Sequence, residues 1–398
     1  MKKLSEQLRR HCRQKAILGS SSRIRGAPVI VTALSPRDVW IKDCESRGYE
    51  RVAVYRNGQT EIGFVSERVD FAPENLSFIG NYEETVGFLA EVDSAARQYR
   101  TRTRRQRRAR DSNGYGTIVP KYWDYSTIKN ITLPVAMVIA SQYDRLSRLN
   151  KWRPAAIDIH NWAPGVLGML KSIGFLELCN VDQQSQGVAR LDSLLIRKMR
   201  AGGSAAGEEI GAFLDDLGLA AVEQDPQIYG ALFEAILNSH NHAYDHVEGA
   251  DGIHLWWLAG ALDEITNELI VCVYDHGVSI PVSLSRPYSK WPLLHTLQEL
   301  WHRAVGHRLE ESDGSQDGLT ISLAMQLGKS RTNESNRGKG LPAIENVIDI
   351  CESGYVAIRS RRGEYTRRKG EEPITTTRVA ALRGTLVVWR LKLPGRQS

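Results

Sequence analysis

The sequence contains few cysteines, no C-x-x-C pair and no long hydrophobic run. Five scattered cysteines in 398 residues exclude a disulfide framework and a cysteine-based zinc site. No apolar stretch approaches the roughly 20 residues that cross a bilayer, and residues 1–15 lack the apolar centre of a signal peptide. We therefore expect a cytoplasmic protein that makes no contact with a membrane.

The histidines are also poorly arranged for a zinc site. His240, His242 and His246 lie close together, but only His242 and His246 have the i, i+4 spacing that places two ligands on one helical face. No residue nearby supplies an evident third ligand, and zinc usually has at least three protein ligands. We therefore do not expect zinc.

Basic residues are concentrated in one segment. Residues 97–110 contain eight arginines and no acidic residue, whereas the whole chain has a net charge of only +6. Blocks of like charge repel one another and rarely pack, so we interpret residues 97–129 as a solvated, arginine-rich linker. The alternative is that Arg97 to Arg110 bind nucleic acid or an acidic partner.

The first part of the chain has the pattern of a small module. Residues 50–56 and 60–66 are β-rich and flank Asn57-Gly58, a dipeptide typical of hairpin turns. A helical pattern follows and runs into the arginines. We expect residues 1–96 to form a small α+β module, and the sequence does not indicate its role.

A second α/β module is expected at residues 130–200. Residues 131–141 form an apolar run suited to a buried strand, another strand follows, and Pro164 opens a helix. This order resembles a STAS domain, a small regulatory fold that often accompanies certain bacterial ATPases. Residues 189–200 have a helical pattern, and residues 201–227, which include a glycine-rich break, are expected to connect this module to the next.

The most informative stretch is residues 228–244. Glu234, Asn238 and His242 follow one another at four-residue spacing, which places all three on one face of a helix. Apolar residues cluster on the opposite side. A carboxylate, an amide and an imidazole in file on one helical face indicate one wall of a site.

Two weaker patterns follow along the chain. An apolar strand pattern ends at Asp275, and Gly277 follows, so that the backbone can approach a ligand while the carboxylate accepts a hydrogen bond. Further on, Gly338 and Gly340 precede a helical pattern, where free backbone N–H groups can hold an anion. Each pattern alone is common in proteins.

The order of these patterns resembles the ATP-binding domain of the GHKL superfamily. That superfamily includes histidine kinases, anti-sigma serine kinases, type II topoisomerases and heat-shock chaperone ATPases. Within residues 228–394 the chain reads E-x-x-x-N-x-x-x-H-A-Y, D-x-G-x-x-I-P, R-G-K-G-L and G-T-x-x-x-x-x-L-x-L-P. The resemblance implies an α/β (α+β) chain whose residues 228–394 form a Bergerat-type sandwich of a mixed sheet and helices.

The resemblance implies ATP and Mg²⁺ as ligands and assigns roles to four residues. Asn238 matches the magnesium ligand, and Glu234 matches the acid that orients or deprotonates the attacking water. Asp275 matches the aspartate that accepts a hydrogen bond from the adenine amino group. Gly277 matches the glycine that lets the base lie close.

The resemblance also implies a phosphate site and a lid. Thr385 matches the threonine near the adenine-side water, and residues 282–335 match the ATP lid, with a helical pattern over 319–330. The residues expected near the phosphates are Gly338, Lys339, Gly340 and Leu341.

Three residues depart from the family pattern. Lys339 stands within the second glycine box, where an apolar or small residue is typical, and it either reaches a phosphate or faces solvent. His276 and Ser279 stand where small residues or glycine are frequent, so the first glycine box is less glycine-rich than usual. The sequence therefore does not decide whether the lid is mobile. His242 either forms a hydrogen bond near the phosphates or makes an ordinary polar contact.

Three functions follow as alternatives. The first is a regulatory ATP-binding protein that hydrolyses Mg-ATP slowly and uses lid closure as a switch for a protein partner or for homodimerisation. The second is a serine kinase of the anti-sigma type; a histidine kinase is disfavoured because residues 183–226 contain no phosphoacceptor histidine. The third is an adaptor for nucleic acid or an acidic partner with a degenerate ATPase domain.

Overall fold

A computed structural model describes most of the chain in two compact units, residues 1–46 and 47–398. In the first unit it describes one helix, α2 (Pro36–Ser46), which begins with a reciprocal cap between Ser35 and Asp38. The described residues are 34–56, 58–69, 72–101, 115–119, 122–150, 154–181, 188–203, 207–217, 226–244, 252–285, 299–303, 313–330 and 340–394.

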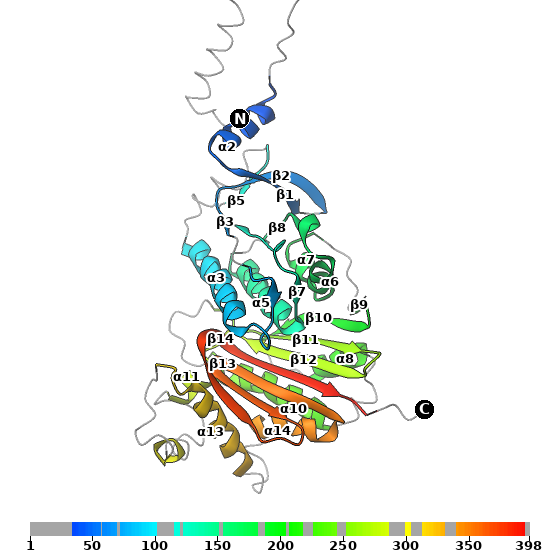
Figure 1. Ribbon diagram of the computed structural model, residues 1–398, viewed down its shortest axis with the longest axis vertical. Coiled ribbons are helices and arrows are strands. Elements are labelled where there is room, and N and C mark those ends of the chain that lie inside the picture. The colour runs from blue at the N-terminus through cyan, green and yellow to red at the C-terminus, as the bar shows by residue number, and fades with distance from the viewer. Residues whose placement is uncertain are drawn as a thin grey trace, which may run out of the picture. The chain divides into compact units, whose positions relative to one another are not determined.

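A six-stranded sheet organises the second unit (Figure 1). Its strands lie in the order β13-β14-β12-β11-β10-β9, and every neighbouring pair is antiparallel. The α/β class predicted from the sequence is confirmed, although the ladders of this sheet are antiparallel throughout. The strands are β9 (Val188–Leu191), β10 (Leu194–Gly202), β11 (Trp256–Asp263), β12 (Glu268–Asp275), β13 (Ser353–Arg368) and β14 (Ile374–Lys392).

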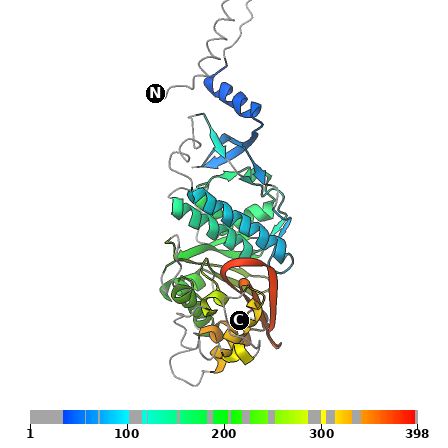
Figure 2. The same ribbon diagram turned by 90° about the vertical axis from the view of Figure 1, so that its left-hand side faces the viewer.

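Helices cover both faces of this sheet (Figures 1 and 2). On one face, which we call the cleft face, lie α8 (Gly207–Asp216), α10 (Pro226–His242), α13 (Asp317–Ser330) and α14 (Gly340–Asn346). On the other, the reverse face, lie α3 (Tyr82–Thr101), α5 (Leu133–Asn150), α6 (Pro164–Ser172) and α7 (Phe175–Leu178).

The strands are apolar at successive positions because both faces are buried. Trp256 packs into the cleft-face core and Trp257 into the reverse-face core. In β12, Val271 and Val273 face the first core, whereas Cys272 and Tyr274 face the second. Side chains alternate along a strand, so two covered faces require a continuous hydrophobic run.

The remaining strands of this unit form smaller sheets. The hairpin predicted around residues 57–58 is confirmed, because β1 (Glu50–Arg56) and β2 (Gln59–Val65) pair antiparallel. They belong to a mixed four-stranded sheet in the order β5-β2-β1-β8. The other short strands are β5 (Thr117–Val119), β8 (Ala156–Ile157), β3 (Arg68–Val69), β6 (Tyr122–Trp123), β4 (Asn75–Leu76) and β7 (Asn130–Ile131).

Two predicted elements are wrong. Residues 131–141 were expected to form a buried strand, but they enter α5, whose residues 135–140 are all fully buried. A buried helix shows no amphipathic period, so its apolar run matches that of a buried strand. Residues 189–200 were expected to form a helix, but they form the hairpin β9-β10, which turns at Asp192 with φ 51°.

This hairpin also changes the expected domain boundaries. Strand β10 continues through residue 202 and pairs with β11, so a boundary at residue 200 would cut a strand of the central sheet. Helices α5 to α7, expected in a separate module, pack on the reverse face of that sheet. The basic segment begins inside α3, which extends to Thr101, and residues 102–110 lie outside the described residues.

Further elements confirm the sequence pattern. The helices predicted over 228–244 and 319–330 are α10 and α13, and the helix predicted after Gly340 is α14. Helix α11 (Ile280–Ser285) follows β12, and short 3-10 turns occupy Ile159–Asn161 and Val347–Ile350. No helix in the described part of the chain is long and apolar enough to cross a bilayer.

Candidate functional site

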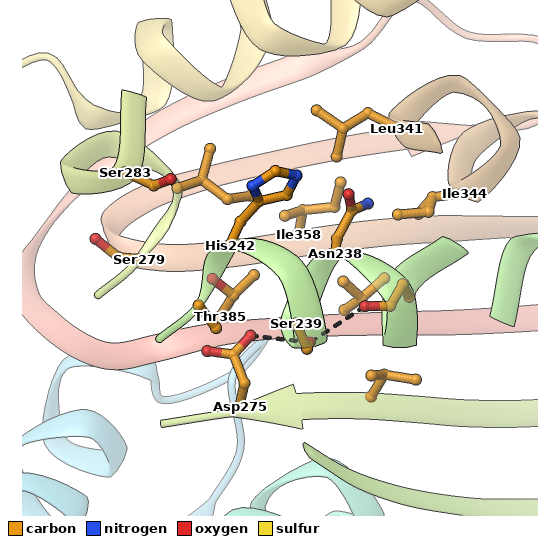
Figure 3. Close-up of a pocket in the computed structure, with 15 residues that line it drawn as sticks. Asn238, Ser239, His242, Asp275, Ser279, Ser283, Leu341, Ile344, Ile358 and Thr385 are labelled. Atoms are coloured by element: carbon orange, nitrogen blue, oxygen red, sulfur yellow. Dashed lines mark hydrogen bonds between the residues drawn. The ribbon is translucent and has the colours of Figure 1, made fainter. Parts of the chain in front are cut away.

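A cleft lies between α10, the end of β12 and the start of α14 (Figure 3). It encloses about 550 Å³, part of which is open solvent. Helix α10 forms one wall because its apolar side packs into the cleft-face core and its polar file turns away from that core. The polar side chains along the cleft include Asn238, Ser239, His242, Asp275, Ser283 and Thr385.

Asp275 is the buried carboxylate of this cleft, with 3% of its surface exposed. Its Oδ1 accepts the backbone N–H of Gly277 at 2.8 Å, and its Oδ2 accepts the hydroxyl of Ser239 at 3.1 Å (Figure 3). Burial raises the pKa of Asp275 to about 6, although these hydrogen bonds and one from the backbone of Thr385 act in the opposite direction. Near neutral pH it is therefore an ionised acceptor held by neutral donors.

Two glycines fix the backbone around Asp275. A β-carbon on residue 277 would lie 2.3 Å from the carbonyl oxygen of Ala243, the same oxygen that accepts the N–H of Val278. A β-carbon on residue 384, where φ is 73°, would lie 1.9 Å from the carbonyl oxygen of Asp275. Gly277 was expected to make room for a base, but the space beside it is occupied by the end of α10.

Asn238 lines the cleft one helical turn before His242. Its Nδ2 is buried and has no hydrogen-bond partner, so its amide N–H groups can donate to a ligand. Within the described residues there is no cluster of histidine, cysteine, aspartate or glutamate that could hold a metal. A magnesium ion at Asn238 would therefore take its other ligands from water and phosphate, which is the habit of this ion.

Glu234 does not belong to the lining of the cleft as Asn238 and His242 do. It lies one turn earlier on α10 and is half-buried, and burial raises the pKa of its carboxyl group. The three residues that the sequence places in one file therefore separate. Asn238 and His242 reach the cleft, whereas Glu234 lies beside it.

Leu341 and Thr385, both predicted as site residues, line the cleft. Thr385 pairs in register with Asp275, and its hydroxyl lies 2.9 Å from that of Ser360. Gly340 begins α14, but Gly338 and Lys339 lie outside the described residues, as do parts of the expected lid between α11 and α13. The described half of the predicted phosphate loop thus contributes Leu341.

Three serines that line the cleft were not predicted as site residues, namely Ser239, Ser279 and Ser283. Ser239 follows Asn238 directly and carries no signal of its own in the sequence, because its role depends on the packing of α10 against β12. Ser279 was noted only as a departure from a glycine pattern. Its backbone has φ 83°, a left-handed value that glycine adopts readily and serine rarely.

His276 faces the reverse side of the sheet. Its Nε2 lies 3.5 Å from the hydroxyl of Ser141 on α5, and its ring packs edge-on against Trp257 and Tyr274, with centroids 5.3 and 5.0 Å away. Its backbone N–H donates to the hydroxyl of Tyr244 at 3.1 Å. His276 therefore joins the end of β12 to the helices behind the sheet and does not line the cleft.

Comparisons of the chain with protein-family models, with curated proteins and with solved structures found no match. The function must therefore be argued from the cleft. What the cleft offers is a buried carboxylate acceptor, an unpartnered amide N–H donor, an imidazole and several hydroxyls in an otherwise aliphatic lining.

Proposed function

We propose that this chain binds ATP with Mg²⁺ in the cleft between α10, the end of β12 and α14. The observation that carries the proposal is Asp275, a buried carboxylate held by Ser239 and Gly277 in a cleft of about 550 Å³. Small-molecule sites are typically apolar clefts with a few fixed polar groups. The motif order that resembles the GHKL superfamily supports the same ligand.

Each end of the cleft suits a different part of the nucleotide. Asp275 would accept a hydrogen bond from the adenine amino group, and the aliphatic side chains of Ile280, Ile358 and Val387 would pack against the base. Asn238 would hold Mg²⁺ through its amide oxygen, and the bound ion would supply positive charge to the phosphates. Leu341 would approach the phosphates from the first turn of α14.

We propose that Mg-ATP binding switches the conformation of the chain and that the bound ATP is hydrolysed slowly. Asp275 and His276 are consecutive residues that contact opposite sides of the sheet, so a ligand that orders the end of β12 also acts on α5 through Ser141. Glu234 lies outside the lining, which favours binding over rapid turnover. Because ATP is an intracellular nucleotide, the proposal puts the chain in the cytoplasm, where a protein partner or a second copy would respond to the switch.

The test is nucleotide binding by the wild-type chain and by Asp275→Asn. We expect the wild type to bind Mg-ATP and Mg-ADP in calorimetry, and Asp275→Asn to bind about tenfold to a hundredfold more weakly, because an amide acceptor replaces a charged one. Asp215→Asn, an exposed position on α8, is the matched control and is expected to bind like wild type. Absence of binding by the wild type would refute the proposal.

Labelled ATP distinguishes the possible fates of the γ-phosphate. Slow release of inorganic phosphate supports a conformational switch driven by ATP hydrolysis. Transfer of the label to a serine of a co-purified protein would instead support a serine kinase. Binding of nucleic acid by residues 97–110 stays a prediction of the sequence, since the structure does not describe those side chains.

A further inference from the structure

Ser279 combines two unfavourable features at one position of the cleft. Its φ of 83° is the largest among the described non-glycine residues with positive φ, and four of the other five are aspartate or asparagine, which tolerate this region. Its side chain is buried, with 5% of the residue exposed, and its Oγ has no hydrogen-bond partner. A glycine would remove both features.

The backbone at Ser279 is held by its neighbours. Val278 donates its N–H to Ala243 at 2.8 Å, and Ile280 donates its N–H to the hydroxyl of Ser360 at 2.8 Å. The carbonyl oxygen of Ser279 accepts the N–H of Ser283 at 2.9 Å, the first hydrogen bond of α11. These three hydrogen bonds hold the backbone on both sides of Ser279 in the left-handed turn.

Helix capping does not account for the serine. A serine at the start of a helix is usually favoured because its Oγ accepts a backbone N–H two or three residues later. Here that hydroxyl accepts nothing within the described residues, although the carbonyl of Ser279 starts α11. A buried hydroxyl that caps nothing, on a strained backbone and beside a cleft, indicates a missing partner.

The structure assigns that partner to the ligand: we infer that the Ser279 hydroxyl forms a direct hydrogen bond with the nucleoside half of the bound nucleotide. This inference rests on the proposed function. Ser279 and Ser283 lie beyond His242, on the side opposite Asn238 and Leu341, which are the residues expected at the metal and phosphates (Figure 3). The group bonded is a polar atom of the ribose or of the base edge.

The experiment compares Ser279→Ala with Ser279→Gly. Alanine removes the hydroxyl and keeps the strained backbone, whereas glycine removes both. With Mg-ADP as the probe in calorimetry, we expect both variants to bind about tenfold more weakly, because each loses one buried hydrogen bond. Without ligand, Ser279→Gly is expected to unfold at a higher temperature than Ser279→Ala, since only glycine relieves the strain.

A second probe locates the bonded atom. If Ser279 contacts the ribose 2′-hydroxyl, Ser279→Ala and wild type bind 2′-deoxy-ADP equally; if it contacts the base edge or the 3′-hydroxyl, the tenfold difference persists. Either result supports the inference.

Wild-type affinity for both nucleotides in Ser279→Ala would overturn the inference while leaving the proposed function intact. Failure of the wild type to bind Mg-ADP would overturn both. A purely structural role predicts a lower unfolding temperature for Ser279→Ala with unchanged affinity, which separates it from the role in binding.

Discussion

The buried carboxylates Asp93 and Asp144 on the reverse face of the six-stranded sheet differ from Asp275 on the cleft face. On the reverse face, Asp144 accepts the indole N–H of Trp257 and the guanidinium of Arg148, each at 3.0 Å. Asp93 lies between Arg383 at 3.0 Å and Arg145 at 3.5 Å. On the cleft face, Asp275 is bonded only by neutral donors, and buried atoms of two other cleft residues have no partner.

This difference separates carboxylates that are neutralised within the fold from one that is not. Asp93 and Asp144 on the reverse face are matched by cations, so they join α3 and α5 to the sheet and are not available to a ligand. The cleft face retains hydrogen-bonding capacity that costs stability, since each buried polar group without a partner costs about 1–3 kcal/mol. Unmet capacity beside a cleft is the property of a binding site.

The strongest test of the comparison is the loss of a carboxylate from the reverse face. Asp93→Ala is expected to lower the free energy of unfolding by about 3–5 kcal/mol, because two guanidinium groups, one of them buried, lose this carboxylate. Urea unfolding measures the loss, and Asp215→Ala on exposed α8 is the control. Mg-ADP affinity of the folded fraction is expected to stay unchanged, and a large loss of affinity would contradict the separation of the two faces.

Asp275 sharpens the comparison through pH. Its pKa in the folded chain is about 6, above the ordinary 3.8, so the cost of burying its charge is full above pH 6 and disappears as pH falls below 4. Asp275→Asn is therefore expected to raise the free energy of unfolding by about 3 kcal/mol at pH 8 and by little at pH 4. Equal free energies of unfolding of the wild type and Asp275→Asn across this pH range would show that burial of the ionised carboxylate does not destabilise the fold.

The same titration acts on binding in the opposite sense. Because the ionised carboxylate is the acceptor, wild-type affinity for Mg-ADP is expected to rise as pH increases through about 6. Calorimetry at pH 5 and pH 7.5 measures this, and Asp275→Asn provides the profile without that contribution.

The smallest effect is expected at Glu234. Because this side chain is not part of the cleft lining, Glu234→Gln should bind Mg-ADP within about twofold of wild type. Phosphate release assays with the same variant show whether Glu234 acts on the attacking water. A tenfold loss of ADP affinity would place Glu234 in the cleft and contradict the conclusion that, of the three α10 residues, only Asn238 and His242 line it.

Much of the cleft face could be predicted from the sequence because its signals are local. A pattern of a few neighbouring residues is enough to predict each of three elements: helix α10, the strand that ends at Asp275 and the helix after Gly340. The motif order then brought Asn238 and Asp275 into one site before any contact was known. Both residues do line one cleft.

The reverse face could not be predicted in the same way. Residues 135–140 of α5 are apolar on every side of the helix, so this stretch has no period that separates it from a strand. The hairpin β9-β10 was missed because tertiary pairing with β11 overrides a helical pattern. The packing role of Gly277 depends on Ala243, which lies 34 positions away in sequence, and no motif indicates that these two residues are in contact.

The alternation of side chains along β12 has a consequence for insertions and deletions. Asp275 and His276 differ by one position, and they lie on opposite sides of the sheet. One residue added within β12 would turn the following side chains over, bringing an imidazole to the cleft and a carboxylate against Trp257. The close approach of Gly384 to the Asp275 carbonyl fixes the register of β12 against β14. Insertions and deletions should therefore be tolerated in the turns of the sheet and not in β12.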